Sequence, residues 1–127
     1  MSAERLPREA FRGARLLRDG TWVVAFLADW CPFCRGFRPE FEGFDGGSSF
    51  RTGMADLTDD DSPLWEDFQI EVVPALVVFS DGRPVYHQQS DPGVGLPSDA
   101  LSRARAVALA ARRYSPRSPE PTEGGPG

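Results

Sequence analysis

Several residue types and sequence patterns are missing from this chain of 127 residues, and each absence excludes a class of protein. All 14 basic residues are arginines, so no lysine can act in catalysis. The formal net charge of −5 argues against a nucleic-acid partner, because phosphate binding needs a basic surface. No apolar run approaches the roughly 18 residues that span a membrane, and residues 1–8 lack the apolar core of a signal peptide. We therefore expect a cytoplasmic protein that contacts neither nucleic acid nor membrane.

Cysteine and histidine are also scarce, because the chain has only Cys31, Cys34 and a single histidine, His87. Structural zinc sites need more ligands than one such chain offers, although two chains could each supply a cysteine pair. In the cytoplasm a lone cysteine pair is not expected to be a structural disulfide. The spacing of the pair favours redox chemistry, with a metal half-site as the alternative. The aspartates at 59–61 lack the spacing of a calcium loop, so no metal or organic cofactor is expected.

The two cysteines follow the apolar run 22–27, which predicts a buried strand because it is short, uncharged and rich in β-branched and aromatic residues. Residues 33–44 predict a helix, whose phenylalanines recur every three or four residues and form one apolar face. Cys31 therefore falls where the strand ends and the helix begins. The unpaired N–H groups and the dipole at a helix N-terminus favour a thiolate. Cys34 lies one turn further on and can close back on Cys31.

The remaining sequence up to residue 114 predicts further alternation of helices and strands. Glycine, proline and aspartate clusters separate the apolar segments. The strand over 50–57 should run parallel to the first strand, because a helix connects the two. The expected segments are a helix over 7–18, a strand over 50–57, a short helix capped by Ser62, a strand over 75–79, a returning strand over 84–89 and a final helix capped by Ser98.

The length suits one domain, which we assign to residues 1–114. Residues 115–127 consist mainly of proline, serine, glutamate and glycine. Such a composition cannot bury enough apolar surface to offset the entropy of ordering the chain. The sequence therefore predicts a disordered C-terminal tail over 115–127.

The order of these elements and three short motifs resemble the thioredoxin family. The motifs are the run Ala28-Asp29-Trp30-Cys31-Pro32-Phe33-Cys34, the helix proline Pro39, and Val73-Pro74 at the entrance of an apolar strand. The resemblance covers about Pro7 to Tyr114. It implies an α/β fold of three layers, in which helices flank a mixed central β-sheet.

The resemblance also implies a chemical role for each cysteine. Cys31 is the nucleophile that attacks a substrate disulfide and forms a mixed disulfide. Cys34 is the resolving thiol, which attacks the Cys31 sulfur and releases the reduced substrate. Pro32, between them, fixes φ in the loop and limits its conformations. The only redox-active group is the Cys31–Cys34 disulfide itself.

Four further residues are expected to surround the pair. By the resemblance, Pro74 is a cis proline beside the cysteines, and the backbone of Val73 pairs with the substrate chain. The alternative for Pro74 is an ordinary proline that opens a strand, where a missing N–H is tolerated. Trp30 is expected to be partly exposed and to shape the docking surface, with a core position as its alternative. Phe33, between the cysteines, is expected to be partly exposed.

Two features depart from the family pattern. Many thioredoxins carry a buried aspartate where this chain has Ala25, so Cys34 lacks its usual base. Asp56, at the end of the strand over 50–57, is the candidate substitute acting through water, and a solvated strand-end residue is the alternative. The Pro32–Phe33 pair is more like glutaredoxins, although the chain lacks their glutathione-binding elements. We therefore expect a disulfide somewhat easier to reduce than in typical thioredoxins.

Together these observations predict a thiol–disulfide oxidoreductase. The predicted enzyme reduces protein disulfides, is recharged by an electron donor of the thioredoxin-reductase type, and acts as a monomer. One alternative is a disulfide oxidant or isomerase on the same fold. The other is a non-enzymatic dimer that binds an iron–sulfur cluster through the exposed cysteines of two chains.

Overall fold

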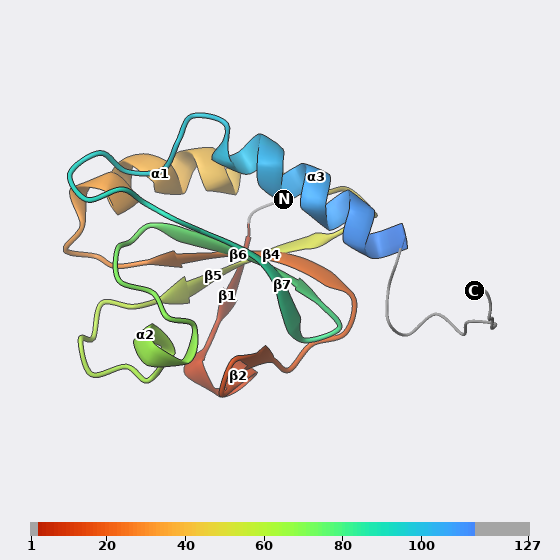
Figure 1. The fold of residues 1–127 in the computed structure, drawn as a ribbon, viewed down its shortest axis with the longest axis horizontal. Helices are drawn as coiled ribbons and strands as arrows, with labels where there is room; N and C mark the ends of the chain where they lie inside the picture. Colours follow the sequence, from red (N-terminus) through yellow and green to blue (C-terminus); the bar gives the residue numbers. More distant parts are fainter. Residues whose placement is uncertain (1–2, 114–127) are drawn as a thin grey trace.

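The computed structural model describes residues 3–113, which form a five-stranded mixed β-sheet with helices on both faces (Figure 1). The strands lie in the order β1-β5-β4-β6-β7. Neighbours pair in parallel from β1 through β5 to β4, and antiparallel from β4 through β6 to β7. The strands of this sheet are β1 (Glu4–Leu6), β4 (Thr21–Leu27), β5 (Arg51–Asp56), β6 (Ala75–Ser80) and β7 (Arg83–Gln89).

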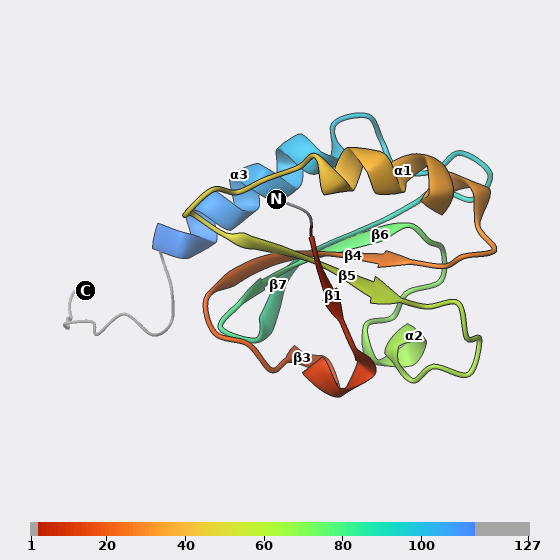
Figure 2. The same ribbon diagram turned by 180° about the vertical axis from the view of Figure 1, so that it is seen from behind.

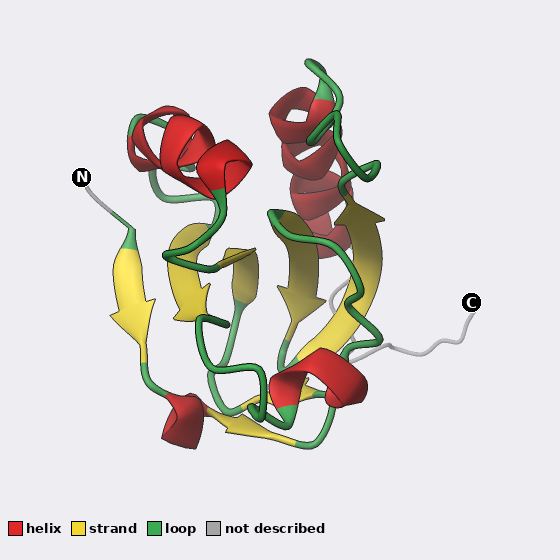
Figure 3. Cartoon of the chain, turned by 90° about the vertical axis from the view of Figure 1, so that its left-hand side faces the viewer, coloured by secondary structure: helices red, strands yellow, loops and turns green. Residues whose placement is uncertain are grey.

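The sheet is the middle of three layers. One face is covered by α1 (Pro32–Glu42) and α3 (Ala100–Arg113) (Figure 2). The opposite face is covered by α2 (Leu64–Asp67), by a 3₁₀ helix (Arg8–Ala10) and by the small hairpin of β2 (Phe11–Arg12) and β3 (Arg15–Leu16) (Figure 3). The predicted α/β fold with three layers is confirmed.

The two central strands are buried because the sheet is covered on both faces. Every residue of β4 and β6 is buried, which explains their uninterrupted apolar runs. The chain leaves β4, passes through α1 and returns as β5, and Leu27 lies opposite Asp56 in the parallel register. The predicted strand–helix–strand unit is confirmed, and it places the start of α1 at the carboxyl edge of the sheet.

Helix α1 packs against the sheet through its phenylalanines. Phe37 and Phe41 are buried, and so is Phe44 just beyond the end of the helix. The ring centroids of Phe37 and Phe41 are 5.9 Å apart, and those of Phe41 and Phe44 are also 5.9 Å apart. Phe33, in the first turn, is 43% exposed. The predicted apolar face is therefore present, and Phe33 lies outside it, as expected.

The predicted helix over 7–18 is wrong. The structure has the 3₁₀ helix, β2 and β3 in its place. Gly13 has φ +56°, a left-handed conformation that a helix does not contain, and it closes the turn between β2 and β3. The side chains at three- and four-residue spacing do not share one face, because Phe11 is buried and Leu17 is 51% exposed. The backbone N–H of Leu16 donates to the carbonyl oxygen of Gly82, so tertiary contacts outweigh the helical pattern.

The second half of the chain follows the predicted order. The strand expected over 75–79 lies in β6, and the Asp81–Gly82 turn connects it to β7. Helix α2 is a single turn whose N-cap is Pro63 instead of the predicted Ser62. The Ser62 hydroxyl, one residue earlier, accepts a hydrogen bond from the N–H of Leu64 at 3.3 Å. Helix α3 begins two residues after the predicted cap and buries alanines at 100, 104 and 108.

The predicted tail over 115–127 lies outside the described residues. Within residues 3–113, no helix combines the length and the apolar character that crossing a membrane requires.

Substituting Gly82 tests the contact that holds the N-terminal hairpin against the sheet. Gly82 has φ +90°, and a Cβ atom there would lie 2.6 Å from the backbone oxygen of Leu16. We expect Gly82→Ala to lower the free energy of unfolding by about 2 to 4 kcal/mol in urea denaturation. Gly36→Ala is the matched control, because Gly36 lies in α1 with open space around it, and this change should stabilise by about 0.5 to 1 kcal/mol. Equal effects of the two changes would contradict this account.

Candidate active site

The two cysteines lie at the junction of β4 and α1, at the carboxyl edge of the sheet. Cys31 is the N-cap of α1, and Pro32 occupies the first helical position, where a missing N–H costs nothing. The backbone N–H of Cys34 donates to the Cys31 sulfur at 3.3 Å. This hydrogen bond stabilises negative charge on the first sulfur. The predicted placement of Cys31 between strand and helix is therefore present.

Both thiols are free and largely buried, with Cys31 5% exposed and Cys34 1% exposed. Burial raises the pKa of the Cys34 thiol from 9.0 to about 12, because a thiolate loses its hydration there. The N–H of Ala28, which donates to the Cys34 sulfur at 3.4 Å, lowers this pKa. The neighbouring Cys31 thiol raises it, and the Arg38 guanidinium lowers it.

The residues before β6 form the wall opposite the cysteines. The peptide bond between Val73 and Pro74 is cis, as expected, and Pro74 directly precedes the strand. The Cys31 thiol donates to the carbonyl oxygen of Val73 at 3.4 Å. The Ser90 hydroxyl donates to the carbonyl oxygen of Pro74 at 2.6 Å. The structure thus brings together residues 31 and 73, which are far apart in the sequence.

Trp30 lies at the surface, with 52% of it exposed. Its indole N–H donates to the carbonyl oxygen of Thr58 at 2.9 Å. The indole ring stacks on Trp65 of α2, with centroids 6.3 Å apart and an interplanar angle of 9°. The core alternative for Trp30 is therefore wrong. Trp65 is itself half-buried and packs against the core.

Phe33 contacts a loop that the sequence did not connect with the site. A Cβ atom on Gly95 would lie 3.0 Å from the Phe33 ring. Gly95 has φ +94° and forms an isolated bridge with Asp91. Val94, beside Gly95, is 68% exposed. The loop 91–95 therefore adds apolar surface next to Phe33. In the sequence, the only signal of this loop is its glycine and proline content.

The structure does not join Asp56 to Cys34 by any hydrogen bond within the described residues. One Asp56 carboxylate oxygen accepts from the backbone N–H of Thr58 at 3.0 Å and from its hydroxyl at 2.6 Å. Ala25 is fully buried opposite Met54, so its position supplies no proton acceptor. The role of Asp56 as a base stays a prediction.

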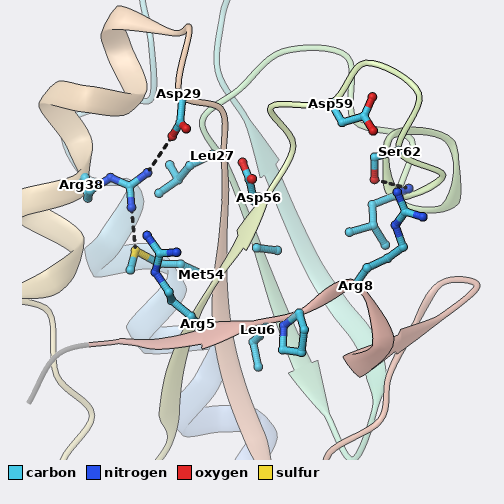
Figure 4. A pocket seen from close by; sticks show the side chains of 13 residues that line it. Arg5, Leu6, Arg8, Leu27, Asp29, Arg38, Met54, Asp56, Asp59 and Ser62 are labelled. Atoms are coloured by element: carbon cyan, nitrogen blue, oxygen red, sulfur yellow. Dashed lines mark hydrogen bonds and ion pairs between the residues drawn. The ribbon is translucent and has the colours of Figure 1, made fainter.

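A surface cavity of about 510 Å³ lies beside the site, between β1, the ends of β4 and β5, and the segment leading to α2 (Figure 4). Its charged lining contains arginines at 5, 8 and 38 and aspartates at 29, 56 and 59. The Arg38 guanidinium lies 3.7 Å from the Asp29 carboxylate. The sequence analysis did not identify Arg38 as a site residue. Its position four residues after Cys34 places the two side chains on one side of α1.

The described part of the chain has no group of three or more His, Cys, Asp or Glu side chains that could hold a metal ion. His87 lies on β7 opposite Val77 of β6.

A family model for thioredoxin matches residues 4–101. The chain belongs to the thioredoxin family. Over 70 residues it is 31% identical to the thioredoxin of Staphylococcus saprophyticus, a match that covers 54% of this chain and 67% of that protein. Over 70 residues it is 33% identical to human thioredoxin-related transmembrane protein 1, which covers 54% of this chain but only 25% of the human protein. The region matched by the family model includes the three motifs on which the sequence resemblance was based.

Solved thioredoxin structures share the fold. The short form of spinach chloroplast thioredoxin f superposes with a TM-score of 0.67 at 18% identity, covering 84% of this chain and 93% of that one. The oxidised mitochondrial thioredoxin 3 of Saccharomyces cerevisiae gives 0.61 at 20% identity, covering 83% and 94%. The thioredoxin fold is thus retained although the segment 7–18 contains a hairpin.

The buried Cys34 thiol should make the stability of the reduced protein depend on alkaline pH. Its pKa is higher in the folded chain than the ordinary 9.0, so the unfolded chain loses this proton first as pH rises. The stabilising contribution is therefore complete below pH 9.0 and is lost as pH approaches about 12. We expect the free energy of unfolding to fall by about 2 kcal/mol between about pH 8 and about pH 10.5 in urea denaturation with reductant.

Cys34→Ala is the control for this alkaline loss, because it removes the titrating thiol. Its free energy of unfolding should lack that part of the decline with pH. Parallel pH profiles for the two proteins would show that Cys34 is not the group responsible.

Proposed function

We propose that this protein is a thiol–disulfide oxidoreductase that reduces protein disulfides through Cys31 and Cys34. The observation that carries the proposal is the position of the Cys31 sulfur. It accepts the N–H of Cys34 at the start of α1 and contacts the carbonyl oxygen of Val73 on the opposite wall. Membership of the thioredoxin family and the shared fold support this chemistry.

In the first step, the Cys31 thiolate attacks one sulfur of a substrate disulfide. A bond forms between the Cys31 sulfur and that substrate sulfur, and the second substrate sulfur leaves as a thiolate. The helix N-terminus and the N–H of Cys34 stabilise the charge on Cys31 before the attack. The thiol of Cys31 must give up its contact with the carbonyl oxygen of Val73 when it ionises, because an ionised sulfur has no proton to donate.

In the second step, Cys34 loses its proton to solvent and attacks the Cys31 sulfur. The bond to the substrate breaks, the substrate leaves with its second thiolate, and the Cys31–Cys34 disulfide remains. The pair has then lost two electrons, and the substrate disulfide has gained them. The nearly complete burial of Cys34 keeps this thiol from reacting with substrates directly.

The surface around Cys31 suits an extended substrate segment with apolar side chains. The backbone beside the cis proline, at Val73, is the proposed pairing site for the substrate chain. The exposed rings of Trp30 and Phe33 and the side chain of Val94 supply apolar contact area around it. Trp30 is held by its hydrogen bond to Thr58, so it offers this surface in a fixed orientation.

We further propose a cytoplasmic location, a monomeric state and an electron donor of the thioredoxin-reductase type. The scarcity of cysteine, with a single pair in 127 residues, supports a reducing compartment. Recharging needs a donor of two electrons, because each turnover leaves the pair oxidised. These statements rest on the proposed activity.

One alternative direction has a specific observation in its favour. The N–H of Cys34 donates to the Cys31 sulfur, and the N–H of Ala28 donates to the Cys34 sulfur. These hydrogen bonds stabilise the reduced pair, and a protein whose reduced form is strongly stabilised acts as a disulfide oxidant or isomerase. The cluster-binding alternative needs both cysteines of each chain at the surface, whereas Cys34 is only 1% exposed.

The two-step mechanism predicts different results for the two cysteine variants. Cys34→Ser should accumulate mixed disulfides between Cys31 and protein substrates, because the resolving thiol is missing. Cys31→Ser should accumulate none and lose at least about 10³-fold of the disulfide-reductase rate. Trapping followed by non-reducing electrophoresis and mass spectrometry, with insulin as substrate, measures both. Activity that survives in Cys31→Ser would contradict the assignment of the nucleophile.

The reduction potential separates a reductant from an oxidant. We expect a value between about −270 and −220 mV for the Cys31–Cys34 pair, somewhat above that of typical thioredoxins. A redox titration against glutathione, followed by thiol alkylation and mass spectrometry, gives this value. A potential above about −180 mV would favour the oxidant or isomerase instead.

A further inference from the structure

Arg38 is the cation that the structure places behind the resolving cysteine. It follows Cys34 by one turn on α1, and its side chain is 32% exposed. Its guanidinium lies 3.7 Å from the Asp29 carboxylate and donates to the Met54 sulfur at 3.8 Å (Figure 4). These contacts from the β4–α1 turn and from β5 hold the guanidinium on the inner side of the helix.

The other elements packed around Cys34 bring few charges. Strands β4 and β6 contain no ionisable residue. The ionisable groups nearby are the Cys31 thiol at the N-cap of α1, Arg35 on α1, Asp29 in the turn and Asp56 at the end of β5, with arginines 5 and 8 further along the cavity. Asp29 faces Arg38, and Asp56 binds Thr58. Among these groups, Arg38 is the one whose charge lowers the pKa of Cys34, with a smaller effect than the N–H of Ala28 that donates to the same sulfur.

We propose that Arg38 is a positioning residue for the second step, whose charge stabilises the Cys34 thiolate in place of a buried base near Ala25. The inference rests on the proposed function and extends it to the activation of Cys34. An arginine cannot accept the proton, because it stays protonated at all accessible pH values. The Cys34 proton therefore passes to solvent, and the charge left on the sulfur is stabilised by the guanidinium.

This arrangement gives the second step a distinctive pH dependence. With a carboxylate base, the rate would be nearly independent of pH once that base is ionised. With Arg38 and solvent, the rate follows the fraction of Cys34 thiolate and rises about tenfold per pH unit below the Cys34 pKa. The raised pKa of Cys34 keeps the neutral and mildly alkaline range on this rising part of the profile. A flat profile from about pH 6 to about pH 9 would contradict the proposal and favour Asp56 as the base.

The two steps can be separated with dithiobis(nitrobenzoate), a small aromatic disulfide. Cys31 attacks it and releases one yellow nitrothiobenzoate, and Cys34 then attacks the Cys31 sulfur and releases the second. Stopped-flow absorbance resolves the two releases. The second release is intramolecular, so it does not depend on how well the reagent binds.

Three variants isolate the charge of Arg38. Arg38→Met keeps an apolar stem and removes the charge, Arg38→Lys restores a charge, and Arg35→Met removes the neighbouring arginine. Arg35 is the matched control, because it is exposed and donates to the backbone oxygen of Asp29 at 2.9 Å. We expect the second release to slow by about three- to tenfold in Arg38→Met, and to return to within about twofold in Arg38→Lys. Arg35→Met should leave it unchanged within about twofold.

The outcomes distinguish a failure of the Arg38 proposal from a failure of the proposed oxidoreductase function. Absence of the first release in the unsubstituted protein would contradict the proposed function. An equal second release in Arg38→Met and Arg35→Met, or a failure of Arg38→Lys to restore it, would overturn the role of Arg38 alone. Ultraviolet thiolate absorbance of Cys34 in Cys31→Ser provides a test without any exchange reaction. There, Arg38→Met should move the titration midpoint upwards by about 0.5 to 1 pH unit, and an unmoved midpoint would overturn the proposal.

Discussion

The site depends on one constraint, which is that α1 begins shortly beyond the end of β4, with Cys31 as its N-cap. This start directs the backbone N–H of Cys34 to the Cys31 sulfur and leaves the Cys34 side chain buried, where its sulfur accepts the N–H of Ala28. The same constraint separates the two thiols chemically, because one sulfur sits at the helix cap and the other lies under the helix. Two identical side chains thereby acquire different reactivity from their surroundings alone.

The sequence predicted the parts of the structure that local patterns determine. The runs at 22–27 and 75–79 are central strands because uninterrupted apolar residues need cover on both faces. The spacing of the phenylalanines predicted the buried face of α1, and the Cys31 position followed from the strand–helix boundary. The cis bond at Pro74 came from the family resemblance, since the residues alone favoured a trans bond.

The remaining features depend on contacts between distant segments. Gly13 closes a hairpin because Leu16 finds a partner at Gly82, which no window over 7–18 contains. Trp30 and Trp65 stack because the turn after β4 and helix α2 meet at one edge of the sheet. The side chain of Arg38 is held by Asp29 in the β4–α1 turn and by Met54 in β5. Local periodicity reports which face is apolar, but it does not identify the partner of that face.

The hairpin of β2 and β3 also bears on the order of events during synthesis. Strand β1 pairs with β5, Phe11 packs its ring on Phe26, Phe68 and Phe79, and Leu16 bonds to the turn before β7. Every one of these partners lies later in the chain. Apolar residues of this segment therefore leave the ribosome before the surface that buries them exists, and they stay available to chaperones or to wrong partners until β6 has emerged.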